Sequence, residues 1–407
     1  MTSVRTSTRR TPLIALLAAD GISRAGNAVT TVAVPLYALA VTGSPFATGI
    51  AGVFATAPII VGGALGGVLV DRFGWRRSGV VADAASGLTS LAIPVLAGLG
   101  ILPFPALLAL VFLSNLLDTP GSTARTAQLP ELAELAGTPL SRATGAHATV
   151  SRTAGMLGVG LAGALVAVVG PANALYACGV FAVSIALTLL FVPADARHHA
   201  TRTEEPAEPY LGALRAGLRF TVRTPLLRAV VILVVTTNMI DAAGLTVLKP
   251  VYARGIGDDG AVLGAILAVF AAGALTGAAA YSAVGHRLPR RGLFVALFLL
   301  AGVPPYLALA LDAPLPAIFA VLALSGLAAG PLNPMIDTAL FGIIPVALRA
   351  RVFGALSAGV AAAMPLGSAL AGLGVEQLGL TGTLFAAAGV YLVAILSTAF
   401  GRRWHGF

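Results

Sequence analysis

Twelve apolar stretches follow one another along the chain, and each is about as long as the roughly 20 residues that a helix needs to cross a bilayer. Their centres lie near residues 26, 57, 89, 115, 156, 182, 238, 272, 301, 328, 364 and 391. Only 10% of the residues are charged, whereas about a quarter of a soluble domain is charged. The sequence therefore predicts an all-α integral membrane protein with 12 transmembrane helices. Prolines at 304–305, 331 and 334 predict kinks in the ninth and tenth spans.

The basic residues indicate which way the chain crosses the membrane. Of the 25 Lys and Arg residues, 21 lie on the side that the two termini share. Lys249 and Arg254 lie near the other side, and Arg24 and Arg152 fall inside spans. Because basic residues gather in cytoplasmic loops, we predict a multi-pass protein of the cell membrane with both termini cytoplasmic. The same distribution explains the net charge of +9 without a nucleic-acid partner.

The turn between the second and third spans carries a cluster of glycines and charges. Glycines at 62, 63, 66 and 67 are spaced to let another helix approach closely within lipid. Asp71 is expected to open a polar turn in which Gly74 takes a positive φ. The segment reads Gly67-Val-Leu-Val-Asp71-Arg72-Phe-Gly74-Trp75-Arg76-Arg77.

This G-x-x-x-D-R-x-G-x-R-R pattern resembles the loop signature of the major facilitator superfamily (MFS) of secondary transporters, with Trp75 in place of the usual basic residue. The resemblance implies the MFS fold, two pseudo-symmetric six-helix bundles that give alternating access to a site between them. It also implies a charged cytoplasmic hinge that locks or releases the bundles. We expect Asp83, which follows Arg77 on span three, to belong to its charge network. The predicted gating residues are Gly67, Asp71, Arg72, Gly74, Arg76, Arg77 and Asp83.

A polar segment divides the chain in two. We predict an N-terminal bundle at 1–193, a cytoplasmic linker at 194–224 and a C-terminal bundle at 225–407. The two halves contain an internal repeat, because Gly-Ala-Leu-Gly-Gly at 63–67 recurs as Gly-Ala-Leu-Thr-Gly at 273–277. The end of the linker is predicted to be an amphipathic helix on the anionic leaflet, with a plain solvated helix as the alternative. Its apolar and basic faces comprise Leu211, Leu214, Leu218 and Val222, and Arg215, Arg219 and Arg223.

Span four and the loop after it indicate which branch of the superfamily the chain resembles. They contain, in order, Asn115-Leu-Leu-Asp118-Thr-Pro120, Ala124-Arg125-Thr-Ala127 and Leu129-Pro-Glu-Leu132. This order resembles the branch of the superfamily that holds macrolide-efflux proteins and the enterobactin exporter. Two features of drug–proton antiporters are missing, namely a proline in the segment 158–163 and a basic residue in the middle of span four. The resemblance implies export of a small lipophilic or amphiphilic compound (a drug, a natural product or a siderophore) by proton antiport.

Ionisable and amide side chains at membrane depth concentrate in four spans. Such groups are costly in lipid and usually face the bundle interior or a water-filled cavity. Spans one, four, seven and ten line the central cavity in the superfamily that the chain resembles, and the polar residues of this chain fall on those spans. The candidate cavity residues are Asp20, Arg24, Asn27, Asn115, Asp118, Asn238, Asp241, Asn333 and Asp337.

Two interpretations of the first carboxylates remain open. Asp20 and Arg24 either take part in transport or form a permanent ion pair that only fixes packing. Asp118 either faces the substrate or simply pairs with Arg125 or Arg152.

Two further carboxylates, Asp241 and Asp337, have no obvious cation near them in the sequence. An unpaired carboxylate in a low-dielectric site favours its neutral form, so these two are the preferred candidates for reversible protonation. Four aromatic residues are candidates to stack on a flat or macrocyclic compound, namely Tyr37, Phe54, Tyr252 and Tyr306.

Two other classes of function compete with export. A nutrient or sugar proton symporter would share the fold, but sugar sites usually present tryptophans, and Trp75 and Trp404 both fall in cytoplasmic segments. A membrane enzyme needs metal ligands or a nucleophile, and the His-His pair at 198–199 is a poor candidate for either. A sensor would be expected to carry a soluble output domain. We therefore expect a transporter, not an enzyme, without cofactor or metal. Its expected partners are a small-molecule substrate, protons and the lipid bilayer, and we expect a monomer.

Overall fold

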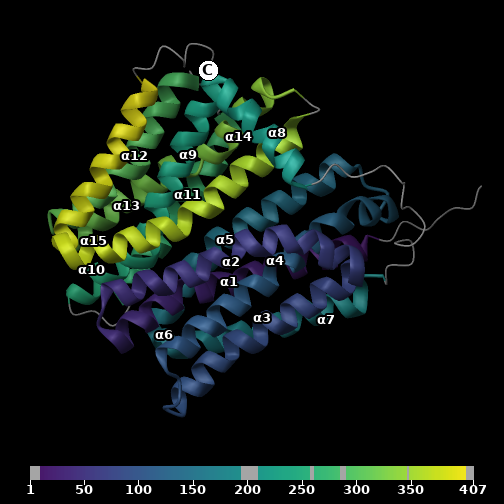
Figure 1. Cartoon of the computed structure of the whole chain (residues 1–407), viewed down its shortest axis with the longest axis horizontal. Helices are drawn as coiled ribbons and strands as arrows, with labels where there is room; N and C mark the ends of the chain where they lie inside the picture. Colours follow the sequence, from purple (N-terminus) through teal and green to yellow (C-terminus); the bar gives the residue numbers. More distant parts are fainter. Residues whose placement is uncertain (1–9, 194–209, 257–260, 285–289, 346–347, 400–407) are drawn as a thin grey trace, which may run out of the picture. The chain divides into compact units, whose positions relative to one another are not determined.

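The structure is a computed structural model that describes residues 10–193, 210–256, 261–284, 290–345 and 348–399 (Figure 1). These residues form helices and short connections, with no strand among them. The helices are α1 Thr11–Thr42, α2 Pro45–Phe73, α3 Trp75–Gly98, α4 Phe104–Leu135, α5 Leu140–Val169, α6 Pro171–Ala174, α7 Phe181–Phe191, α8 Tyr210–Arg223, α9 Pro225–Ala243, α10 Lys249–Gly255, α11 Ala261–Val284, α12 Arg290–Ala310, α13 Leu315–Ala329, α14 Leu332–Ile343 and α15 Arg349–Ala399. A 3₁₀ turn at Leu175–Val180 precedes α7, and a π-helical turn at Gly244–Leu248 joins α9 to α10.

The all-α membrane fold predicted from the sequence is confirmed. Among the described residues, 10 helical segments are long and apolar enough to span a bilayer. One of these, Val352–Ser397, contains two spans because its backbone leaves the helical conformation at Gly379, where φ is 72°. The 29-residue helix α2 supplies a further span, so the described helices accommodate the twelve predicted spans. Exposed leucines and valines on these helices suit contact with lipid, since Leu88, Val168 and Leu190 are 72%, 83% and 74% exposed.

The proline predictions are confirmed in one span of the two. Span ten breaks between α13 and α14, where Pro331 precedes the first residue of α14. Pro304 and Pro305 lie inside the single element α12, and the kink expected there stays a prediction.

The packing divides the chain into two compact units. The first comprises Met1–Thr31, Pro58–Gly158 and Ala172–Thr203, and the second comprises Val32–Ala57, Val159–Pro171 and Glu204–Phe407. The second unit therefore includes the ends of α1 and α5 and the beginning of α2, together with the helices that follow the linker.

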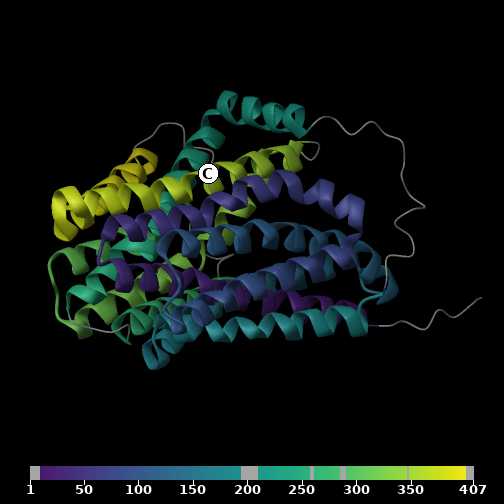
Figure 2. The same ribbon diagram turned by 60° about the horizontal axis from the view of Figure 1, so that its bottom comes forward.

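In the first unit, α3 packs along α4 and along α7, and the two views in Figures 1 and 2 show these helices side by side. Small polar residues line the contact between α3 and α4. Ser86 donates a hydrogen bond to the Ser114 carbonyl oxygen at 3.1 Å, and the Ser90 and Ser114 hydroxyls lie 3.2 Å apart. The glycine prediction for α2 holds at Gly62, where a Cβ would lie 2.8 Å from Thr119 Cβ of α4. Short side chains thus let these helices approach closely, as lipid-embedded helices require.

In the second unit, glycines again mark the close helix crossings. A Cβ at Gly277 of α11 would collide with the Leu327 carbonyl of α13, and one at Gly330 would collide with the Ala274 carbonyl. Within this unit, α5 and α11 also meet through glycine, since a Cβ at Gly163 would lie 2.8 Å from Gly264 Cα. These contacts explain why glycines recur in these apolar helices: a larger side chain at the same positions would collide with the backbone of the neighbouring helix.

The predicted linker helix is present as α8. Leu218 and Val222, on its predicted apolar face, are 55% and 52% exposed, as a helix lying on a membrane surface requires. Residues 194–209 of the predicted linker lie outside the described residues.

Candidate functional site

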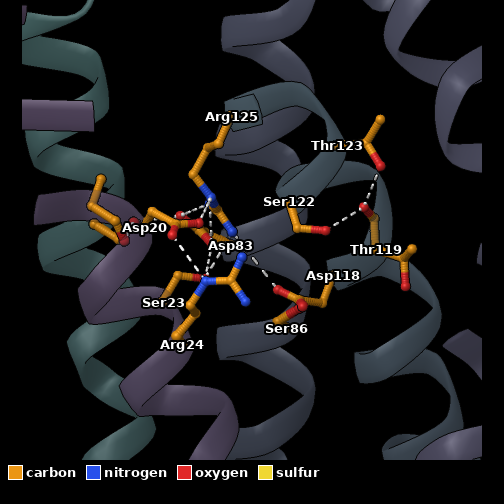
Figure 3. A network of polar contacts seen from close by, with 12 residues as sticks. Asp20, Ser23, Arg24, Asp83, Ser86, Asp118, Thr119, Ser122, Thr123 and Arg125 are labelled. Carbon is orange, nitrogen blue, oxygen red and sulfur yellow. Dashed lines mark hydrogen bonds and ion pairs between the residues drawn. The ribbon is translucent and has the colours of Figure 1, made fainter. Parts of the chain in front are cut away.

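A buried cluster of charged side chains joins α1, α3, α4, α5 and α7 in the first unit, with Arg125 at its centre (Figure 3). Three carboxylates approach Arg125, from Asp20 of α1, Asp83 of α3 and Asp118 of α4. A buried charge is tolerated only when it is paired and hydrogen-bonded.

Arg125 is only 2% exposed, and each part of its guanidinium has a partner. Nη1 donates to both carboxylate oxygens of Asp83, at 3.0 and 3.1 Å, and Nη2 donates to the Ser23 hydroxyl at 2.9 Å. Nε lies 3.3 Å from Asp20 Oδ1. The planar fork of arginine therefore ties helix α4 to α1 and α3 at once.

Serine hydroxyl groups also donate to the two buried carboxylates. Ser23 donates to Asp83 Oδ1 at 2.9 Å, and Ser184 donates to Asp83 Oδ2 at 2.6 Å. Asp20 Oδ2 accepts from Arg24 Nε at 2.9 Å and from Ser151 at 2.7 Å. Both carboxylates are at most 1% exposed.

Two members of the cluster are more accessible than the rest. The side chains of Arg24 and Asp118 are 36% and 21% exposed. Asp118 Oδ1 is 4.0 Å from Arg125 Nη2 and makes no hydrogen bond among the described residues. Asn27 also faces this carboxylate. The cluster therefore has a closed core at Arg125 and an accessible edge at Asp118.

Two ion pairs that the sequence analysis considered are present in the structure. Asp20 and Arg24 do form an ion pair, and Asp118 is paired with Arg125. Asn115 lies nearby on α4, but its amide donates to the Val111 carbonyl of its own helix at 2.9 Å.

The sequence counts Arg125 among the basic residues on the side of the termini and places it in the polar stripe of span four; the structure buries it, because α4 continues beyond it to Leu135. The serines at 23, 151 and 184 were not predicted.

The gating motif is partly described. Gly74 has φ 84° and precedes the first residue of α3, as predicted. Asp71 does not open the turn, because α2 runs on to Phe73; the side chains of Gly67, Asp71 and Arg72 lie outside the described part of the structure. The chain thus turns only at Gly74.

Two basic residues of the motif differ in their surroundings. Arg76 donates to the Thr188 carbonyl at 3.4 Å and to the Leu189 carbonyl, at the C-terminal end of α7. Arg77 is exposed. Asp83 pairs with Arg125 inside the first unit, so it belongs to the buried cluster described above.

In the second unit, Asp241 and Lys249 flank the π-helical turn of span seven. The Asp241 side chain is exposed, although it lies within the 31-residue apolar segment Pro225–Gly255. Lys249 interacts electrostatically with it, so the expectation that Asp241 has no nearby cation is wrong. Asn238 donates to the Val234 carbonyl at 2.8 Å.

The second unit holds two further candidates, on α14. Asn333 is exposed, and the side chain of Asp337 lies outside the described residues.

Two of the candidate stacking aromatics are packed in the core. Tyr306 is 3% exposed and donates to the Ile240 carbonyl at 3.0 Å. Tyr252 is 5% exposed and donates to Asp312 Oδ1 at 3.1 Å. The other two candidates, Tyr37 and Phe54, are partly exposed.

Comparison with known proteins agrees with this architecture. Residues 6–403 match the family described as transmembrane secretion effector. The multidrug efflux pump Tap of Mycolicibacterium fortuitum is 31% identical over 390 residues, which cover 94% of this chain and 93% of that protein. Tap of Mycobacterium tuberculosis H37Rv is 30% identical over 387 residues, covering 94% and 91%.

Solved transporter structures share the fold. A D-xylose–proton symporter superposes with a TM-score of 0.75 at 16% identity, covering 97% of each chain. The D323A mutant of the nucleoside transporter NupG gives a TM-score of 0.72 at 13% identity, covering 96% of this chain and 98% of that one. At such identities the likeness concerns the fold alone.

Proposed function

Because the chain belongs to the transmembrane secretion effector family of the major facilitator superfamily, we propose that it exports a small lipophilic or amphiphilic cation in exchange for protons. The observation that carries the proposal of export is the similarity to multidrug efflux pumps along 94% of the chain. Charged residues within the apolar helices of both units, buried at Arg125 in the first unit and exposed at Asp241 in the second, support a transport pathway, because charged groups in apolar helices usually mark substrate or proton routes.

We assign the exchange of proton and cation to Asp241, with Asp337 as its counterpart on span ten. Asp241 is exposed within an apolar segment and interacts electrostatically with Lys249. Protonation from the outer side would neutralise it and release a bound cation. Deprotonation on the inner side would restore its charge and rebind one.

The membrane supplies the driving force for this cycle. Inward movement of one proton releases about 2.3 kcal/mol per 100 mV of membrane potential, in addition to the pH gradient. The two bundles would rock around the site and expose it to each side in turn. We further propose that both termini are cytoplasmic and that the protein works as a monomer.

Transport by the purified protein in liposomes tests this proposal. A fluorescent lipophilic cation is supplied, a pH gradient is imposed, and accumulation is recorded for the wild type, Asp241→Asn and Asp337→Asn. Glu376→Gln is the matched control, because it neutralises an exposed carboxylate of α15 outside the proposed pathway. We expect the gradient to drive accumulation by the wild type and the control only.

Two results would contradict parts of the proposal. If both aspartate variants respond to the gradient as the wild type does, the assignment of the proton sites is wrong. If the proton and the compound move in the same direction, the protein is a symporter, the alternative that the sequence left open.

A further inference from the structure

We propose that Lys249 is a ligand-binding residue of the second unit, which holds an anionic group of the transported compound while Asp241 holds its cationic group. The compounds that this site favours are therefore zwitterions, which carry both charges. This inference rests on the proposed function, because it adds an anion-binding residue to the site assigned to Asp241. It narrows the proposed substrate from a cation to a cation that also carries a negative charge.

The first support is that two opposite charges are accessible within one apolar segment. Asp241 is exposed and Lys249 is partly exposed, and both lie inside the 31-residue segment Pro225–Gly255. Each interacts electrostatically with the other, but neither side chain forms an ion pair or a hydrogen bond among the described residues. Charged groups in apolar helices are costly, and they usually face a pathway or pair with another group. A compound with both charges would give each side chain a close partner of opposite sign.

The second support is the π-helical turn Gly244–Leu248, which lies between the two residues. In an uninterrupted α-helix, residues eight positions apart point about 80° away from each other. A π-helical turn, whose hydrogen bonds span five residues instead of four, rotates less per residue and so brings positions 241 and 249 closer to one face. Single turns of this kind are frequent at functional sites. The turn therefore aligns the carboxylate and the ammonium along one side of span seven.

The third support is the set of aromatic residues around the two charges. Asp241 interacts electrostatically with Tyr306 of α12 and Tyr391 of α15, which are each 3% exposed. Buried residues of two other helices thus lie near the carboxylate, which places it toward the interior of the second unit. The Lys249 ammonium lies 5.4 Å from the centroid of the Phe270 ring of α11, which is partly exposed. This cation–π contact positions the ammonium without neutralising its charge, so the charge stays available to an anionic group.

These observations favour a zwitterion over a simple cation. A cation that binds Asp241 is repelled by Lys249, and this repulsion is stronger in a low-dielectric site than in water. An anionic group on the same compound adds an attraction to Lys249 that offsets the repulsion. At 1.5 Å per residue, the Cα atoms of the two residues lie about 12 Å apart along the segment. The favoured compound therefore carries its two charges on well separated atoms.

Binding of two rhodamine dyes to the detergent-solubilised full-length protein tests the inference. Tetramethylrhodamine is a zwitterion near neutral pH, and its methyl ester is a cation with the same ring system. Fluorescence anisotropy gives the dissociation constant of each dye. The ratio of the two constants is the readout, because a general loss of folded protein or of apolar contacts changes both constants together.

Variants of the two charged residues should change this ratio in different ways. Lys249→Met should weaken binding of the zwitterion about tenfold or more, as expected for the loss of one charge-assisted contact, without weakening binding of the ester. Lys249→Arg keeps the charge and should keep the preference of the wild type. Asp241→Asn should weaken binding of both dyes. Arg254→Met is the matched control, because Arg254 is an exposed basic residue of the same helix α10, and its ratio should equal that of the wild type.

The outcomes separate this inference from the proposed function. If Lys249→Met binds the two dyes in the ratio of the wild type, or if the wild type does not bind the zwitterion, the inference fails, whatever the liposome assay shows for Asp241. If Lys249→Met loses the preference while Asp241→Asn still responds to the pH gradient, the anion-binding role stands and the assignment of the proton site fails. Lys249→Gln is a second neutral variant, which keeps the test decisive when Lys249→Met does not fold.

Discussion

Removal of Arg125 should destabilise the protein more than any other single change in the charged cluster. The guanidinium makes hydrogen bonds to Asp83 and Ser23 and lies 3.3 Å from Asp20, at 2% exposure. In Arg125→Met, both Asp83 and Asp20 lose the guanidinium that lies 3.0 and 3.3 Å from them. Breaking one partner out of a buried ion pair costs about 3–5 kcal/mol. We expect Arg125→Met to lose about that much free energy of unfolding.

The partner variants make the argument quantitative. Arg125→Lys keeps the charge but loses the fork that bridges Asp83 and Ser23, so we expect a loss of about 1.5–3 kcal/mol. The double variant Asp83→Asn, Arg125→Met also removes the Asp83 carboxylate charge, which Arg125→Met alone leaves buried without its guanidinium. The double variant should therefore be about 1–3 kcal/mol more stable than the sum of the two single losses predicts.

Denaturant unfolding of the detergent-solubilised protein, followed by circular dichroism, measures these differences. Arg77→Met is the matched control, because Arg77 is an exposed arginine on α3, and its change should stay within about 0.5 kcal/mol. The reasoning is refuted if Arg125→Met unfolds with the control, or if the effects of Arg125→Met and Asp83→Asn simply add.

Three further changes test other contacts. Arg76→Ala removes the donor to the last carbonyls of α7 and should cost about 0.5–1 kcal/mol, measured as faster amide hydrogen exchange at the end of that helix. Gly264→Val places a side chain against the Gly163 carbonyl, so transport of the fluorescent cation should fall at least tenfold, whereas Gly292→Val, which has open space, should retain it. Asp71→Asn should lower the turnover rate more than the affinity for the transported cation, and an affinity loss equal to the rate loss would argue against a gating role.

Local sequence signals predicted the helices well. Apolar length placed the spans, Gly74 ended α2 with the expected positive φ, and Pro331 broke span ten. These features depend on residues that are close in sequence, where backbone sterics and the bilayer thickness act directly. The turn was expected to open at Asp71, a few residues before Gly74, because no sequence signal marks the last turn of a helix within a polar segment.

The partners within the cluster could not be predicted in the same way. Asp83 was assigned to the hinge because it follows Arg77 by six positions. Six helical residues turn the side chain by about 240° from its starting direction, so Arg77 faces outward and Asp83 is buried. Its actual partner, Arg125, lies 42 positions away on another helix. Such pairs depend on how helices pack, which the periodicity of one helix does not contain.

Direct recording of proton movement tests the central claim of proton antiport. Liposomes that contain the purified protein and a trapped pH-sensitive dye are given the lipophilic cation on one side, with no pH gradient at the start. The exchange mechanism predicts that protons move opposite to the cation in the wild type and in Glu376→Gln, and that this movement is lost in Asp241→Asn. Movement of the cation without protons, or with protons in the same direction, would contradict it.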